Sequence, residues 1–182
     1  MRPSHAQEVV TETDTPIGID MSASESSAIV GQRVNYELPY PGMLPDNPFY
    51  FLKALRDGIV KLLINDEMTM ARFSLENAEK RMYAGQLLLE KNKDKLAIET
   101  ISKSNNYLDD ARNAVVSAQR QNPKDPDVKP FLLQFRSAVL KHREIAHDSR
   151  KLVDKDLSGY FAVEEERIDE AMKQVNSLLQ IR

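Results

Sequence analysis

The stretch "MTMARFSLENAEKRMYAGQLLL", Met68 to Leu89, decides the fold class of this chain. Apolar and small residues recur in it at alternating steps of three and four: Met68, Ala71, Leu75, Ala78, Met82, Gly85 and Leu89. This spacing places side chains on one stripe of an α-helix, in the pattern by which helices pack against one another. The stretch therefore predicts an amphipathic helix over about 66–91 whose stripe alternates large and small residues.

The same stripe recurs downstream. A helix over 94–121 would carry Ala97, Ile101, Ser104, Leu108, Ala111, Val115 and Ala118. A helix ending near 155 would carry Leu132, Phe135, Val139, His142, Ala146, Ser149 and Val153, and a last helix over 160–182 would carry Phe161, Ile168, Ala171, Val175 and Leu178. Each stripe has the width of a face that is buried against other helices.

Breaking residues separate these helices. The segment "QNPKDPDVKP", residues 121–130, holds three prolines, and the turn Asp156-Leu157-Ser158-Gly159 is expected to divide the last two helices. No stretch alternates apolar and polar residues as a strand does. The sequence predicts an all-α fold, an up-and-down antiparallel helical bundle of about five helices over residues 40–182.

The first of the five helices is predicted over 47–64, behind the proline-rich segment of residues 40–48. Asp46 or Asn47 would cap it, and Pro48 fits the first turn, where a missing N–H costs nothing. Its stripe consists of Leu52, Leu55, Ile59 and Leu62, widened by Phe49, Phe51 and Leu63. We expect the bundle to bury this stripe, and the alternative is that surplus apolar residues meet a partner or an anionic membrane surface.

Residues 1–39 have a different composition and are predicted to be a flexible acidic tail or linker. The first 46 residues hold two basic and seven acidic side chains, and the remainder of the 182-residue chain holds 23 basic and 21 acidic ones. A nearly neutral body lacks the basic patch that nucleic-acid binding requires, so no nucleic-acid partner is expected. The tripeptide Ser4-His5-Ala6 has the small-x-small pattern of a signal-peptide cleavage site, which favours export.

Residues that could carry chemistry are few. The chain has no cysteine, which excludes thiol nucleophiles and thiolate metal sites, and it has no catalytic or nucleotide-binding motif. Glu144 and His147 form one E-x-x-H, but a di-iron bundle needs two such motifs and two further glutamates. His142 is expected in the core, and the acidic run Val163–Glu170 is expected to be a solvated face. We expect no enzyme, no cofactor and no metal.

One stretch is similar to a known family. "PGMLPDNPFYFLK" followed by "LENAEKRMYAGQLLLEKNK" resembles an uncharacterised family of mostly exported bacterial proteins, in which P-G-x-L-P-D-x-P-x-Y-x-L-K opens a helical domain. The matching residues are Pro41, Gly42, Leu44, Pro45, Asp46, Pro48, Tyr50, Leu52 and Lys53. The similarity covers about residues 40–121, whereas residues 122–182 match only in being helical. The resemblance implies a helical fold and a secreted or periplasmic setting, and it implies no reaction.

Together these observations predict a non-enzymatic, extracytoplasmic helical module that binds another envelope or secreted protein. The predicted partner-binding residues lie in the proline-rich segment and at the start of the first helix: Tyr40, Leu44, Phe49, Tyr50, Phe51, Lys53 and Arg56. Two alternatives remain at this point: a metal-binding bundle that uses Glu144, His147 and acids of the last helix, and membrane-surface binding through the helix over 47–64. The oligomeric state is open.

Overall fold

The computed structural model describes residues 33–180, which form five helices. They are α1 (Tyr50–Leu63), α2 (Glu67–Glu90), α3 (Asp94–Gln121), α4 (Val128–Leu152) and α5 (Lys155–Leu179). No strand occurs among the described residues. The predicted all-α class and the antiparallel bundle are therefore confirmed.

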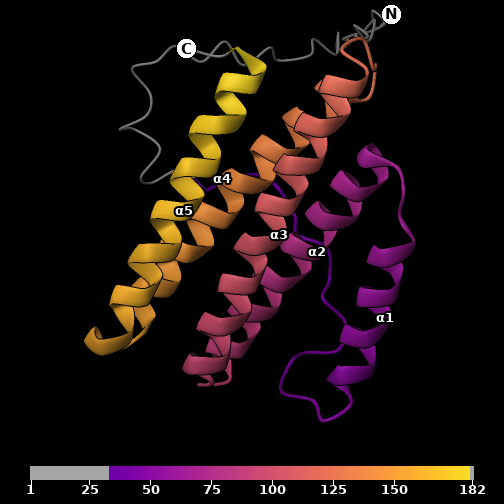
Figure 1. Cartoon of the computed structure of the whole chain (residues 1–182). Helices are drawn as coiled ribbons and strands as arrows, with labels where there is room; N and C mark the ends of the chain where they lie inside the picture. Colours follow the sequence, from indigo (N-terminus) through magenta and orange to yellow (C-terminus); the bar gives the residue numbers. More distant parts are fainter. Residues whose placement is uncertain (1–32, 181–182) are drawn as a thin grey trace, which may run out of the picture. The chain divides into compact units, whose positions relative to one another are not determined.

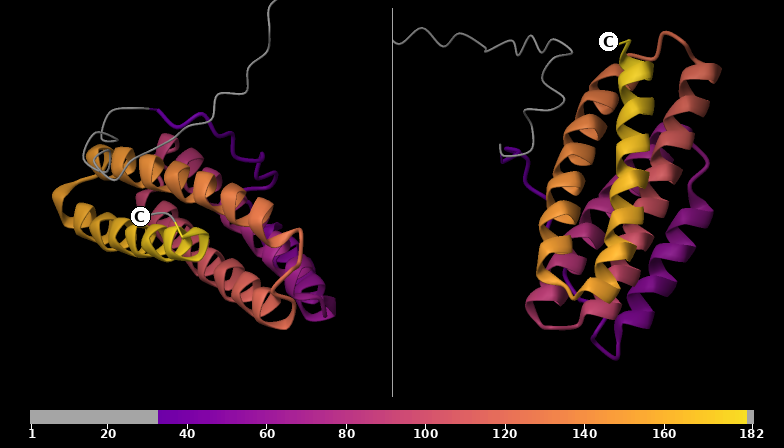
Figure 2. Two further views of the ribbon diagram at one scale, coloured as in Figure 1. Left: turned by 90° about the horizontal axis from the view of Figure 1, so that it is seen from above. Right: turned by 90° about the vertical axis from the view of Figure 1, so that its left-hand side faces the viewer.

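Helices α2 to α5 form a ring around one core. α2 packs along α3 and α4 along α5, while α3 also contacts α5 and α2 contacts α4. Consecutive helices run in opposite directions, as Figures 1 and 2 show. The stripes predicted for α2 and α3 are buried at every position, and those of α4 and α5 are buried except at Val153 and Leu178, which are partly exposed. α1 lies outside this ring, beside α2 and α3.

The hairpin between α2 and α3 is closed by backbone geometry. Asn92 adopts the left-handed conformation with φ of 56°. Its N–H donates to the carbonyl of Leu89 at 2.9 Å, and the N–H of Lys93 donates to the carbonyl of Leu88 at 2.9 Å. These two bonds satisfy the last carbonyls of α2 and turn the chain back at once. The two helices pack closely near this turn: a Cβ added to Gly85 would overlap Cγ1 of Ile101 on α3 and lie 3.0 Å from Cδ1 of the same side chain.

The break between α4 and α5 lies earlier than predicted. α4 ends at Leu152, Val153 and Asp154 are extended, and α5 begins at Lys155. The predicted turn at 156–159 is therefore wrong, because these residues form the first turns of α5 and the amides of Leu157 and Ser158 bond to the carbonyl of Asp154. A single glycine is tolerated inside a helix whose other residues are buried on one side.

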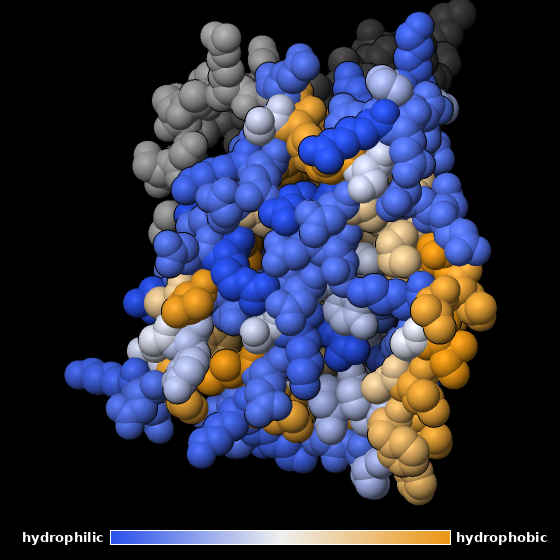
Figure 3. All heavy atoms as spheres, viewed as in Figure 1, coloured by the Kyte–Doolittle hydropathy of each residue, from blue (hydrophilic) through white to orange (hydrophobic). Residues whose placement is uncertain are grey.

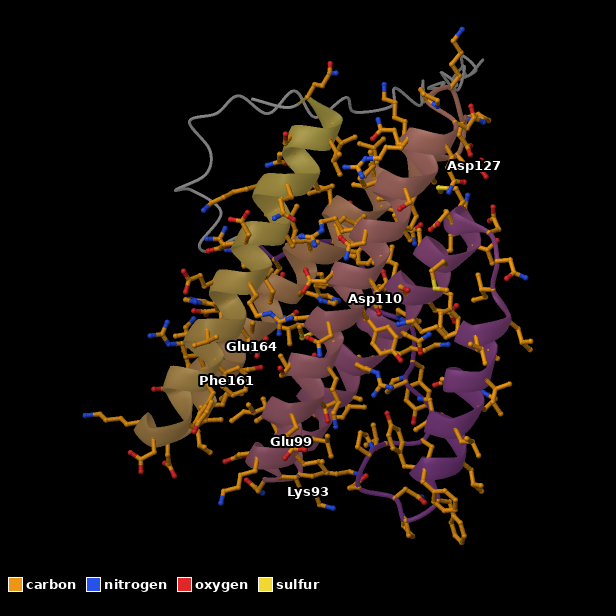
Figure 4. The ribbon with its side chains drawn as sticks, viewed as in Figure 1. Lys93, Glu99, Asp110, Asp127, Phe161 and Glu164 are labelled. Atoms are coloured by element: carbon orange, nitrogen blue, oxygen red, sulfur yellow. The ribbon has the colours of Figure 1, made fainter. Side chains whose placement is uncertain are left out.

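Polar residues are built into the core at defined places. Ser104 of α3 donates to the carbonyl of Ala78 on α2 at 2.7 Å. Asn105 of α3 donates to Oε2 of Glu164, which Figure 4 labels on α5, at 2.7 Å, and Arg167 contacts the same oxygen at 3.1 Å. Glu164 is only 7% exposed, so the prediction of a solvated acidic face is wrong at this position. Its carboxylate is buried because it links α3 to α5.

The predicted tail over 1–39 falls mostly on residues 1–32, outside the described residues. Residues 33–39 are described and lie along the bundle. The N–H of Val34 donates to Oε2 of Glu144 at 2.6 Å, and the hydroxyl of Tyr36 donates to the buried carboxylate of Glu79. Burial raises the pKa of Tyr36 and also that of Glu79. Val34 and Tyr36 thus tie this short segment to side chains of α4 and α2.

Candidate docking surface on the first helix

Helix α1 turns its polar side toward the bundle. Asp57 is its buried residue, at 5% exposure, and no other residue of α1 is buried. Tyr50, Lys53 and Lys61 lie on the same stripe at helical spacing and are partly exposed. The side of α1 that meets the bundle therefore carries charges and a phenol instead of aliphatic side chains.

Polar contacts fasten this inner side to α2 and α3. Nζ of Lys61 lies 2.6 Å from Oδ2 of Asp110 on α3, which Figure 4 labels, and 5.7 Å from the centre of the Tyr107 ring. The hydroxyl of Tyr50 accepts from Arg81 of α2 at 2.8 Å, and that guanidinium lies 4.9 Å from the same Tyr107 ring. A partly exposed pair such as Lys61 and Asp110 contributes about 1 kcal/mol or less. The docking of α1 is consequently weak in comparison with the burial of an apolar stripe.

The surroundings of the inner side shift two pKa values. Burial raises the pKa of Tyr50. Burial also lowers the pKa of Lys53, whose Nζ donates to the carbonyl of Pro41 at 2.6 Å. Arg56, at the margin of this side, pairs with Asp57 through Nη2 and Oδ1 at 2.8 Å. The one buried charge of α1 is thus neutralised by its sequence neighbour.

The opposite side of α1 is apolar and faces water. We define the outer face of α1 as eight side chains that are 38–83% exposed: Phe49, Phe51, Leu52, Leu55, Ile59, Val60, Leu62 and Leu63. Figure 3 shows them as a continuous hydrophobic strip along the edge of the molecule where α1 lies. Contiguous exposed apolar patches are uncommon on monomeric proteins and are typical of surfaces that contact other molecules.

The expectation that the bundle buries the stripe of α1 is therefore wrong. Leu52, Leu55, Ile59 and Leu62 are exposed by 53%, 60%, 52% and 83%. An amphipathic pattern predicts that two faces exist, but it does not determine which of them meets the rest of the chain. Here the polar face finds charged and aromatic partners on α2 and α3, and the apolar face is left outside.

The predicted partner-binding residues separate into three groups. Phe49 and Phe51 belong to the outer face, and Arg56 lies among its residues with a side chain that is 69% exposed. Tyr50 and Lys53 lie on the inner side. The aliphatic residues of the outer face were missed because their regular spacing is also that of a core stripe.

The other two predicted residues, Tyr40 and Leu44, lie in the proline-rich segment. Tyr40 is 72% exposed and meets Tyr83 of α2 edge to face, with ring centres 6.4 Å apart. Leu44 is partly exposed, and its carbonyl accepts from Asn47 at 3.0 Å. Among the described residues, no hydrogen bond and no aromatic pair joins these two side chains to the outer face of α1.

The proline-rich segment is anchored at the α2–α3 turn instead of capping α1 as predicted. Oδ2 of Asp46 accepts from Lys93 at 2.9 Å and from Lys91 at 3.1 Å, and these two bonds lower the pKa of Asp46. Asn47 accepts from the N–H of Phe49 at 2.9 Å, and α1 begins only at Tyr50. The segment thus fixes where α1 starts, because Asp46, four residues before Tyr50, is held at the α2–α3 turn.

The residues considered for a metal site point to separate partners. Glu144 accepts from Val34, whereas Nδ1 of His147 lies 3.2 Å from Oε1 of Glu165 on α5. Arg150 pairs with the other oxygen of Glu165 at 3.0 Å. Within residues 33–180, no three histidine, aspartate or glutamate side chains gather as they would around an ion. The E-x-x-H motif therefore makes ion pairs and hydrogen bonds in this structure.

No described helix combines the length and the apolar character that crossing a membrane requires.

The model of a family described as a domain of unknown function (DUF5667) matches residues 42–151 of the chain. No curated protein and no solved structure matches the chain. The matched residues begin in the proline-rich segment and include the whole of α1.

Proposed function

The chain belongs to the DUF5667 family of domains of unknown function, and from that premise we propose that it is a non-enzymatic helical module that holds another protein on the outer face of α1. In this proposal the ring of α2 to α5 is a rigid support. α1 is the recognition element, and the proline-rich segment fixes its position.

One observation carries the proposal: α1 presents its apolar side to water although the same chain builds a well-packed core a few residues later. The outer face exposes two phenylalanines and six aliphatic side chains. An amphipathic helix that docks by its apolar side is a common way in which proteins recognise one another. Large apolar and aromatic side chains are also those that contribute most to the centres of protein interfaces.

The proposal places the module outside the cytoplasm. The support is in the sequence: Ser4-His5-Ala6 resembles a cleavage site, and the segment from Pro41 to Lys53 resembles the opening signature of mostly exported bacterial proteins. The partner would then be another protein of the envelope or a secreted protein.

A role without chemistry is supported by the state of the titratable side chains. His142 is fully buried in the core, and His147 pairs with Glu165. Among the described residues, neither imidazole hydrogen-bonds to a hydroxyl group, and neither belongs to a metal-binding set.

The experiment compares two double variants of the full-length protein in the cells that produce it. In Leu55→Gln/Ile59→Gln the outer face of α1 becomes polar; in the control, Leu133→Gln/Val163→Gln, apolar residues that are 49% and 56% exposed on α4 and α5 are changed in the same way. Intact cells are treated with a membrane-impermeant amine crosslinker, and the linked peptides are identified by mass spectrometry. Circular dichroism verifies that all three proteins are equally helical.

The proposal requires crosslinks from the lysines of α1 to one protein, retained by the control and lost by the α1 variant. Crosslinks that persist in the α1 variant would remove the outer face from the contact. Crosslinks that appear only after the cells are lysed would contradict the extracytoplasmic setting.

A second candidate is binding to a membrane surface, because α1 is amphipathic and carries three basic residues. Two of them, Lys53 and Lys61, contact Pro41 and Asp110 on the inner side, so Arg56 is the cation nearest to the outer face. Co-sedimentation with anionic and with neutral vesicles tests it. Binding to neither kind of vesicle would reject this candidate.

A further inference from the structure

We propose that a second copy of this chain covers the outer face of α1, so that two α1 helices pack antiparallel across a twofold axis. This inference rests on the proposed function, since it names the partner of the same surface. A twofold contact uses the same patch on both chains, so the patch must be complementary to itself in size, shape and charge. The outer face meets each of these requirements.

The size of the outer face matches that of a stable dimer. Its eight side chains, at 38–83% exposure and with each free side chain presenting roughly 150–250 Å², leave on the order of 900 Å² of apolar surface in water. A stable interface buries roughly 800 Å² on each partner, whereas the largest apolar patch of an ordinary monomer covers about 300–600 Å². The outer face therefore has the area of one half of a dimer interface.

The shape of α1 favours the close approach of another helix. Gly58 stands in the helix interior, where glycine is less stable than alanine, and a Cβ added to it would meet no atom within 4 Å. No contact within the described chain explains this glycine. Ala54 lies one turn before it, and these two small residues border the outer face on the side of Phe51 and Leu62, where they let a second helix backbone come near. In the proposed dimer, bulky residues of the second α1 lie over Gly58 and fill the open space beside it.

The charge of the outer face permits contact with itself. Its eight side chains are uncharged, and Arg56, which lies among them at helical spacing from Leu52 and Ile59, is already paired with Asp57 of the same helix at 2.8 Å. Two copies therefore meet without a buried unpaired charge, which would oppose association. The inward contacts of Lys53 and Lys61 also leave few cations near the outer face, which makes an anionic lipid surface a poorer match.

The antiparallel direction follows from the ends of the helix. The aromatic residues Phe49 and Phe51 lie at the beginning of α1, and Leu62 and Leu63 lie at its end. An antiparallel pair places the aromatic end of each helix against the leucine pair of the other, and the two helix dipoles then oppose each other favourably. Leu55 and Ile59 lie in the middle of the outer face, so Leu55 of one copy meets Ile59 of the other.

Sedimentation equilibrium of the full-length protein over a wide range of concentration tests the inference. The wild type and the control Leu133→Gln/Val163→Gln should both be dimers, whereas Leu55→Gln/Ile59→Gln should weaken dimerisation by a factor of about 100 or more. Gly58→Leu provides a second variant that cannot fail by losing its helix, because leucine is a better helix former than glycine. It should be as helical as the wild type and monomeric.

The chain has no cysteine, so single cysteines can be introduced to test the relative direction of the two α1 helices. A mixture of Phe51→Cys and Leu62→Cys chains should form crosslinked pairs with a short bis-maleimide, whereas Phe51→Cys alone should not. Crosslinking of Phe51→Cys with itself would show a parallel pair and overturn the proposed arrangement.

Two results would reject a second copy as the occupant. One is a wild type that stays monomeric at every concentration, and the other is a dimer that survives both α1 variants. If the wild type is monomeric and the in-cell crosslinks still depend on Leu55 and Ile59, the proposed function stands and only the identity of the partner changes. If those crosslinks do not depend on Leu55 and Ile59 either, both proposals fail.

Discussion

Acid should weaken this bundle through one residue, His142. Its side chain is fully buried in α4, and neither ring nitrogen bonds to a protein group among the described residues. Burial lowers the pKa of His142 to about 3 from its usual value of 6.5. In the folded protein the imidazole therefore stays neutral over the whole range in which a free histidine gains a proton.

The sign and size of the effect follow from linkage. As the pH falls below 6.5, the unfolded chain gains a proton at His142 that the folded chain does not gain until about pH 3. Above pH 6.5 the titration of His142 does not lower the free energy of unfolding. Between pH 6.5 and about pH 3 it lowers the free energy of unfolding by about 1.4 kcal/mol for each unit by which the pH decreases. At pH 5 the loss reaches about 2 kcal/mol, which lowers Tm by roughly 4–8 °C for a domain of this size.

The assay is chemical and thermal unfolding, followed by circular dichroism between about pH 7.5 and pH 5. Three proteins are compared: the wild type, His142→Leu, and His147→Leu, which changes an exposed histidine of the same helix. The loss of unfolding free energy between about pH 7.5 and pH 5 should be present in the wild type and in His147→Leu, and it should disappear in His142→Leu. Other groups, including Glu79 with its raised pKa, titrate in all three proteins and cancel in the comparison.

His142→Leu should also be more stable than the wild type at neutral pH by about 1 kcal/mol or more, because it removes two buried polar atoms that lack partners. An equal loss of stability in His142→Leu and the wild type between the two pH values would refute the reasoning. It would mean that the imidazole is not held neutral in the folded state.

Two further substitutions test the packing described above. Gly85→Ala should destabilise the fold by about 1 kcal/mol, because the overlap of its Cβ with Ile101 costs more than the higher helix propensity of alanine gains. The control Gly159→Ala, where a Cβ meets no atom, should be neutral or stabilising. Equal stability of the two variants in urea unfolding would contradict the close packing of α2 on α3. Tyr36→Phe should cost about 1–3 kcal/mol, because the buried carboxylate of Glu79 loses its donor, and limited proteolysis should cut residues 33–39 faster. Unchanged cleavage and stability would show that this bond does not hold the segment.

The ring of helices could be predicted from the sequence almost residue by residue. The stripe from Met68 to Leu89 alternates large and small residues over six steps, and a pattern of that length fits only one helical face. The break between α4 and α5 was misplaced because the backbone of Val153 and Asp154 ends the helix without a proline or glycine, while Gly159 stays helical.

The candidate site could be predicted only in part. The sequence pointed to the start of α1, and two of its predicted residues, Phe49 and Phe51, do belong to the outer face. Which face of α1 turns outward depends on contacts such as Lys61 with Asp110, 49 residues apart, and no local pattern specifies them. The hydrogen bond between Tyr36 and Glu79 joins residues that are 43 positions apart, so it could not be predicted from a local pattern either.

The polar inner side of α1 gives this helix an unusual dependence on ionic strength. The pair between Lys61 and Asp110 is partly exposed, so sodium chloride should screen it and loosen α1 from α2 and α3. Sulfate salts strengthen the burial of apolar groups, so they should tighten whatever covers the outer face. The two sides of α1 therefore respond to different salts. The choice of salt can then separate the anchoring of α1 to the bundle from its binding of a partner.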